Sequence, residues 1–120
     1  MASGTIKKFM DGSVASYSHT HENFTGTIYV KKIGPVVEVS AYNIKPNSAI
    51  DADGSLSFGT MPEAYRPTTS AIVRGYAGKG SRNGAVTIGA NSGSIIYYNV
   101  SDTTMTVNST IDIGMVYFHE

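Results

Sequence analysis

The residues best suited to metal chemistry are the two histidines of His19-Thr20-His21. On an extended chain, residues two apart point to the same side, so both imidazoles could reach one ion. Three copies of such a strand around an axis would surround the ion. Two histidines in a polar segment are more often solvated surface groups, so we predict no metal site and no cofactor.

The acidic residues offer two other kinds of chemistry, and neither pattern is complete. Asp51-Ala52-Asp53-Gly54 resembles the start of a calcium loop, but the third oxygen ligand and the later bidentate Glu are missing. An Asp-Gly turn before a strand explains these residues. The nine acids lie mainly in turns and form no pair suited to glycoside cleavage. With no cysteine and no Gly-x-Ser-x-Gly motif, we expect the protein not to be an enzyme.

Groups suited to holding a saccharide are more abundant. Sugars are bound by aromatic faces together with planar polar side chains that pair with neighbouring hydroxyls, and the chain has eight Tyr and no Trp. Alternating tyrosines are also expected from strand packing, with one of Tyr97 and Tyr98 facing inward and the other outward. The predicted saccharide-binding residues are Tyr97, Tyr98, Asn99, Arg82, Asn83, Asn47 and Asp51.

A rigid corner, Met61–Pro67, is the element best placed to organise the chain. Pro62 and Pro67 each fix φ and remove a backbone donor, so neither a regular helix nor a central strand can run through the segment. The flanking residues read as strands, and corners of this kind join the two sheets of a β-sandwich. We predict a structural corner of Pro62, Tyr65, Arg66 and Pro67, with the Arg66 guanidinium binding carbonyls or Glu63.

Most of the remaining chain has the period of two that is typical of strands, and no stretch of ten residues has a convincing helical period. This predicts an all-β, jelly-roll-like antiparallel β-sandwich. Residues 1–23 are expected to form an N-terminal connector with one short strand at most, and 24–120 the head domain. The predicted strands are 25–32, 36–44, 56–60, 71–77, 85–90, 94–100, 104–109 and 111–118.

Composition excludes several classes of partner. The 120 residues suit one domain, and nine basic residues balance nine acidic ones. A chain without net charge has little attraction for nucleic acid or anionic lipid, so we expect neither partner. No apolar run approaches the roughly 18–20 residues of a membrane span.

Four segments together resemble a known group of proteins. They are IYVKKIGPVVEVS (28–40), GTMPEAYRP (59–67), AVTIGANSGSIIYYN (85–99) and GMVYF (114–118). The pattern is similar to the C-terminal head domains of tailed-phage baseplate and tail-fibre proteins, over roughly residues 24–120. Met61, Ala64 and Asn91-Ser92-Gly93 stand where Leu, Gly and Asp-Gly are usual.

The resemblance implies a homotrimeric receptor-binding head at the phage tail tip or baseplate, in the virion. Such heads usually bind saccharides on the bacterial surface, and the expected partners are that polysaccharide, further copies of the chain and other tail proteins. The group shares no sugar-binding motif, so no site residue is carried over. Three alternatives stay open: a structural tail module, a glycan-degrading tail enzyme and a trimeric signalling jelly roll of the tumour-necrosis-factor type.

Overall fold

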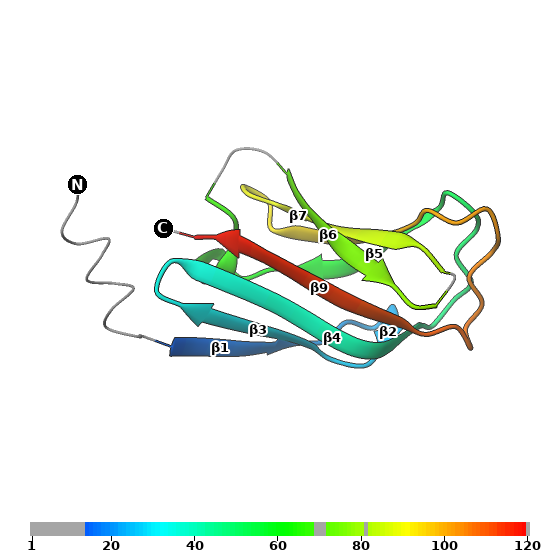
Figure 1. Cartoon of the computed structure of the whole chain (residues 1–120), viewed down its shortest axis with the longest axis horizontal. Helices are drawn as coiled ribbons and strands as arrows, with labels where there is room; N and C mark the ends of the chain where they lie inside the picture. The colour runs from blue at the N-terminus through cyan, green and yellow to red at the C-terminus, as the bar shows by residue number, and fades with distance from the viewer. Residues whose placement is uncertain (1–13, 69–71, 81, 120) are drawn as a thin grey trace.

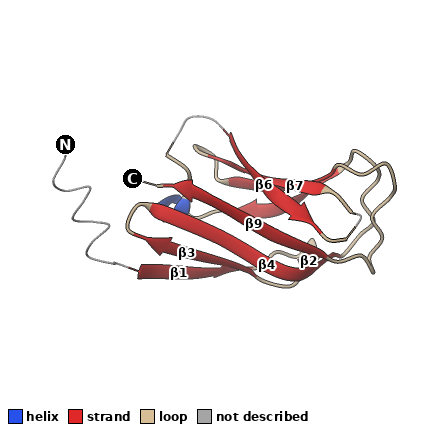
Figure 2. Ribbon diagram, in the orientation of Figure 1, coloured by secondary structure: helices blue, strands red, loops and turns tan. Residues whose placement is uncertain are grey.

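The computed structural model describes residues 14–68, 72–80 and 82–119 (Figure 1). Strands joined by loops make up almost all of these residues (Figure 2), and none of their helices is long or apolar enough to cross a membrane. The elements are β1 (Val14–His19), β2 (Phe24–Thr25), β3 (Ile28–Ile33), β4 (Val36–Pro46), β5 (Ser55–Thr60), the 3₁₀ helix η1 (Glu63–Tyr65), β6 (Ile72–Gly78), β7 (Gly84–Gly89), β8 (Ser94–Asn99) and β9 (Ile111–Phe118).

The strands form one antiparallel sheet in the order β1-β3-β4-β9-β6-β7-β8-β5, with β2 paired to the end of β4. The sheet curls until its first and last strands meet. His19 on β1 and Asn23 after it bond to the carbonyls of Phe58 and Ser57 on β5. The Phe24 ring stacks on Phe58 with centroids 4.0 Å apart. The all-β antiparallel fold predicted from the sequence is therefore present.

Alternation along each strand decides which side chains enter the space that the sheet encloses. On β3, Ile28 and Val30 are buried while Tyr29 and Lys31 are exposed, because neighbouring residues point to opposite faces. Cross-strand partners share a face, so one apolar set lines the inside of the curl. Its members include Phe24, Ile28, Val30, Val37, Val39, Phe58, Met61, Val86, Ile88, Ile95, Tyr97 and Ile113.

The hairpin predicted over 25–44 is confirmed as β3 and β4, joined at Gly34-Pro35. The strand predicted over 104–109 is wrong, since only Met105 there pairs, in an isolated bridge to Ile50. Within the predicted connector 1–23, the expected short strand is β1, and it pairs along its whole length with β3. Tyr17 and His19 pack against the core, which explains why this polar stretch is held in the sheet. Residues 1–13 of that connector lie outside the described residues.

The curled sheet has two ends of different character. At the corner end, Met61 bonds to Gly93 and His119 to Pro35, so the corner, two turns and the end of β9 lie together. Val14 also lies there, paired with Ile33 (Figure 1). At the loop end, which is remote from Val14, residues 47–54, 79–80, 82–83 and 100–110 of the connections gather.

Candidate functional site

Two hollows of similar size lie at opposite ends of the molecule. The corner-end hollow measures about 420 Å³ and the loop-end hollow about 440 Å³. In one hollow the polar side chains already make hydrogen bonds within the protein, and in the other many of their donors and acceptors have no partner among the described residues. The second hollow is therefore the better candidate for binding a ligand.

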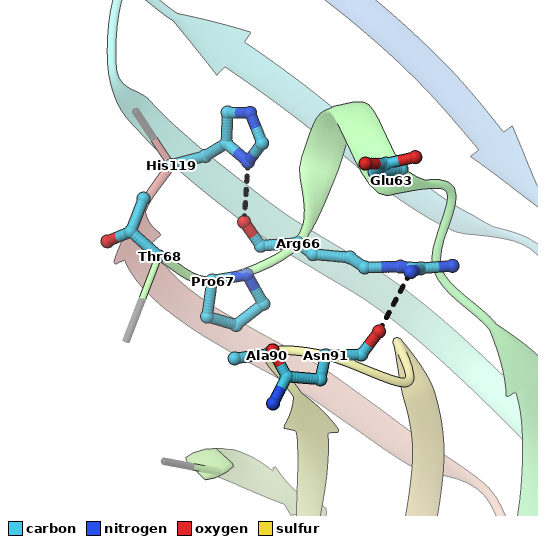
Figure 3. A pocket seen from close by; sticks show the side chains of 7 residues that line it. All are labelled: Glu63, Arg66, Pro67, Thr68, Ala90, Asn91 and His119. Atoms are coloured by element: carbon cyan, nitrogen blue, oxygen red, sulfur yellow. Dashed lines mark hydrogen bonds between the residues drawn. The ribbon is translucent and has the colours of Figure 1, made fainter. Parts of the chain in front are cut away.

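The corner-end hollow is lined by groups that hold the corner together (Figure 3). The Arg66 guanidinium donates to the carbonyl of Met61 at 2.8 Å and to that of Asn91 at 2.9 Å, and not to Glu63. The Arg66 carbonyl is itself bonded to His119 Nδ1 at 2.6 Å. Arg66 thus ties the corner to the β7–β8 turn and to the end of β9.

The other corner residues are also built into the fold. Pro62 precedes η1, and Pro67 is buried. The Tyr65 ring stacks on Tyr17 with centroids 5.7 Å apart, and its carbonyl accepts a 2.5 Å hydrogen bond from the Tyr117 hydroxyl. Burial raises the pKa of Tyr117, so this phenol stays protonated as a donor. The corner end is a structural joint.

The loop-end hollow has more polar groups to spare. It lies between the β6–β7 turn and the long β8–β9 loop, and is lined by Lys79, Arg82, Ser101, Asp102, Thr103, Ser109 and Thr110. The guanidinium of the half-buried Arg82 has one hydrogen bond to the described residues, a long one of 3.4 Å to the Ser101 hydroxyl. Among the described residues, its other N–H donors have no partner, so they can serve a ligand. Cations beside several hydroxyls suit a polar, hydroxyl-rich molecule.

Asn99 organises the backbone behind this hollow. Its side chain is fully buried, and its Nδ2 lies 2.9–3.1 Å from the carbonyls of Ile50, Asp51 and Thr103. Its Oδ1 accepts hydrogen bonds from the backbone N–H and the hydroxyl of Ser101. One amide thus fixes the β4–β5 loop and the β8–β9 loop relative to each other.

The predicted saccharide-binding residues fall into two groups: buried residues that support the fold, called framework here, and residues at the surface. Asn99 and Tyr97 are framework, since both are fully buried. Tyr97 packs edge-on against Phe24, and its pKa is raised by burial, partly offset by the nearby Arg82 charge. A sugar at the surface cannot stack on this ring. Tyr98 instead faces outward from β8, opposite Ala85 on β7.

The remaining predicted residues lie at or near the loop end. Arg82 and Asn83 belong to the β6–β7 turn, and Asp51 is exposed in the β4–β5 loop. Asn47 is used by the fold, because its amide donates to the Glu22 carbonyl at 2.7 Å and accepts from the Thr25 hydroxyl. The structure therefore brings most of the predicted set to one end of the molecule.

The histidine pair is not arranged for a metal. His19 is buried, with Nε2 2.5 Å from the Phe58 carbonyl and Nδ1 2.9 Å from the Tyr17 hydroxyl, so both ring nitrogens are occupied. His21 Nδ1 accepts from the Asn23 backbone N–H. Within the part of the chain that the structure describes, no three His, Cys, Asp or Glu side chains group as metal ligands do.

Sequence reasoning did not identify Lys79 or the hydroxyl-bearing residues 101–110 as part of the site. The signal was the density of Ser and Thr between Ser101 and Thr110. The strand predicted over 104–109 does not place these residues beside Arg82, whereas the long loop that the structure has there does.

No protein-family model matches the chain, and no curated protein matches it by sequence. The structure, however, is similar to the crystal structure of the head domain of phage bIL170, presented as one of the receptor-binding domains of lactococcal phages. The TM-score is 0.66 at 15% sequence identity, over 90% of this chain and 100% of that one. The chain has the fold of a phage receptor-binding head domain.

Proposed function

We propose that this chain is the receptor-binding head of a phage tail or baseplate protein, and that it binds bacterial cell-surface saccharide without chemical turnover. The observation that carries the proposal is the match to the whole bIL170 head domain with a TM-score of 0.66. The site of action is then the tail tip of the virion, at the surface of the host cell. The curled sheet serves as a jelly-roll-like sandwich that presents the loop end.

The loop-end hollow supports saccharide as the ligand. Arg82 and Lys79 supply donors, while Ser101, Thr103 and Thr110 supply hydroxyls that can exchange hydrogen bonds with sugar hydroxyls. Asp102 is the one carboxylate among the described residues that line it, whereas glycoside cleavage normally uses a pair. Binding without cleavage fits this set.

We further propose that the head is a homotrimer, as the resemblance to phage heads implies. Val14, Ile33, Val36 and Phe118 are successive cross-strand partners on the outer face of β1, β3, β4 and β9. Val14 and Phe118 are each more than half exposed. This apolar row suits contact with another copy, and joining several heads raises the avidity of weak single sites.

The test is binding of the purified protein to whole host cells and to their isolated cell-wall polysaccharide, with the oligomeric mass measured by sedimentation. We expect saturable binding to both, with the polysaccharide left at its original length. Arg82→Gln should weaken binding about tenfold, because hydrogen bonds to a charged donor contribute about 1.5–3 kcal/mol. Arg74→Gln is the matched control, since this exposed arginine lies on the outer face of β6.

Two results would contradict the proposal. Binding to neither cells nor polysaccharide would favour a structural tail module. Shortening of the polysaccharide during incubation would favour a glycan-degrading enzyme instead.

A further inference from the structure

One row of side chains crosses the outer face of the sheet between two exposed tyrosines. Tyr29 on β3 lies opposite Ser40 on β4, Ser40 opposite Gly114 on β9, and Gly114 opposite Tyr76 on β6. Tyr29 and Tyr76 are 56% and 54% exposed. Along this row, Tyr29 and Tyr76 therefore flank two residues of which only Ser40 has a side chain, and the Tyr76 ring lies over Gly78 on the same strand.

No steric contact or backbone conformation among residues 14–68, 72–80 and 82–119 requires the glycine in this strip. Gly114 is exposed within β9, does not adopt positive φ, and a Cβ built on it would meet no atom of the described residues within 4 Å. Gly75 on β6 is different, because a Cβ there would collide with Met115. A glycine inside a strand weakens the strand, and it often marks a place where a ligand or another backbone approaches closely. At Gly114 the backbone of β9 is therefore exposed to solvent, although there is room for a side chain at this position.

Polar groups border the strip on its loop-end side. Asp112 lies two residues before Gly114 on the same face, and its Oδ1 accepts a 2.9 Å hydrogen bond from the Asn43 backbone. Lys79 Nζ lies 3.7 Å from the same oxygen and bonds to the Asn43 side chain. Lys79 also lines the loop-end hollow. Lys79 therefore connects the hollow, which it lines, to Asp112 at the border of the strip, so the strip and the hollow are neighbouring parts of one surface.

The dimensions and chemistry of the strip suit a sugar. Three strand intervals separate Tyr29 from Tyr76, which places their backbones about 14 Å apart. A sugar ring has an apolar face that stacks on an aromatic ring and a rim of hydroxyls that needs polar partners. Tyr76 and Tyr29 offer the faces, and the Ser40 hydroxyl and Asp112 carboxylate offer partners at the rim.

We propose that this surface, formed by Tyr29, Ser40, Gly114, Tyr76 and Asp112 and called here the tyrosine strip, binds a segment of the same polysaccharide that enters the loop-end hollow. The inference rests on the proposed function and adds a second contact to it. A polysaccharide accounts for the strip better than a second copy of the chain does. Beyond the two tyrosines, the row continues with Ser18, Ala85, Tyr98 and Ser55, and it contains no aliphatic side chain larger than alanine.

Gly114→Leu is the direct test, because it fills the strip without a conformational or steric conflict. We expect an unchanged fold and oligomeric mass, and binding to isolated polysaccharide weakened at least about tenfold, as loss of one stacked contact implies. Val116→Leu is the matched control, since it adds bulk to the same face of β9 two residues away. Tyr29→Ser with Tyr76→Ser removes both rings from exposed positions and should weaken binding similarly, even if the leucine variant fails to fold.

The outcomes separate this inference from the proposed function. If Arg82→Gln loses binding while the strip variants bind like the wild type, the inference is overturned and the proposed function stands. If Gly114→Leu alters the oligomeric mass, the strip contacts a second copy and the inference is wrong. If the wild-type protein binds no polysaccharide, the proposed function fails and the inference fails with it.

Discussion

The Nε2 atom of His19 lies 2.5 Å from the backbone carbonyl oxygen of Phe58, 39 residues further along the chain. A carbonyl only accepts, so Nε2 carries the proton and Nδ1 accepts from the Tyr17 hydroxyl. β1 and β5 are the first and last strands of the sheet order. This one imidazole therefore joins the two edges of the curled sheet.

Replacing His19 with alanine should destabilise the protein by about 2–3 kcal/mol, because the buried Phe58 carbonyl loses its partner. Urea unfolding followed by circular dichroism measures this change. Ser18→Ala is the control, since Ser18 is exposed on the other face of β1 and should change stability little. Equal effects of the two substitutions would show that the contact between β1 and β5 contributes nothing.

The sequence predicted the strands from β3 to β9, including the edge strand β5, and not the other edge strand, β1. Most of the predicted strands alternate between apolar and polar residues, and their inward side chains are buried in the same enclosed core. β1 has no such signal, because its inward residues are a tyrosine and a histidine rather than aliphatic side chains. Its place in the sheet depends on contacts with Phe58 and Tyr65, which are distant in sequence. Pattern reasoning along a single strand cannot find such partners.

The sequence predicts which types of residue form the candidate site, but it does not predict which way their side chains point. The polar residues at Asn47, Asp51, Arg82 and Asn99 do lie near one end, since turns between antiparallel strands gather there. Whether an amide faces solvent or the backbone depends on which carbonyls surround it. The Asn99 side chain faces three backbone carbonyls, so it is buried and does not reach the surface.

Alanine substitution at two glycines with positive φ distinguishes the cost of backbone strain from the cost of a steric conflict. Gly80 has φ +61° and open space around it, whereas Gly93 has φ +71° and a Cβ there would lie 2.6 Å from the Met61 carbonyl oxygen. Gly80→Ala should cost about 1–2 kcal/mol from the left-handed backbone alone. Gly93→Ala should cost about 1–3 kcal/mol more, because it also displaces Arg66 from the corner. Chemical denaturation of both variants measures the difference, and equal losses would contradict the role given to Arg66.

Alkaline pH should reveal the two buried phenols. Burial raises the pKa of both Tyr97 and Tyr117 in the folded protein. The unfolded chain releases these protons above about pH 10 while the folded chain keeps them, so folding stability is complete below that pH and falls above it. We expect absorbance titration to show tyrosines that ionise at ordinary pH and a further set that ionises only on unfolding.

Tyr117→Phe provides the control for that titration. The variant lacks one buried phenol and should show a smaller late phase. It should also lose about 1 kcal/mol of stability at neutral pH, since the Tyr65 carbonyl loses its donor. A titration in which all tyrosines of the wild type ionise together while the fold persists would disprove the assignment.

Asn99→Asp should separate the framework of the loop end from its surface. A carboxylate at this position would face the carbonyls of Ile50, Asp51 and Thr103 without a donor, and would be buried. We expect a loss of about 3 kcal/mol or more, together with loss of polysaccharide binding, because both loops beside Arg82 lose their common anchor. Asn108→Asp makes the same chemical change at an exposed position of the β8–β9 loop and should leave both properties unchanged. Amide hydrogen exchange of residues 50–54 and 100–105 locates the effect, and a variant that exchanges and binds like the wild type would show that Asn99 does not organise the site.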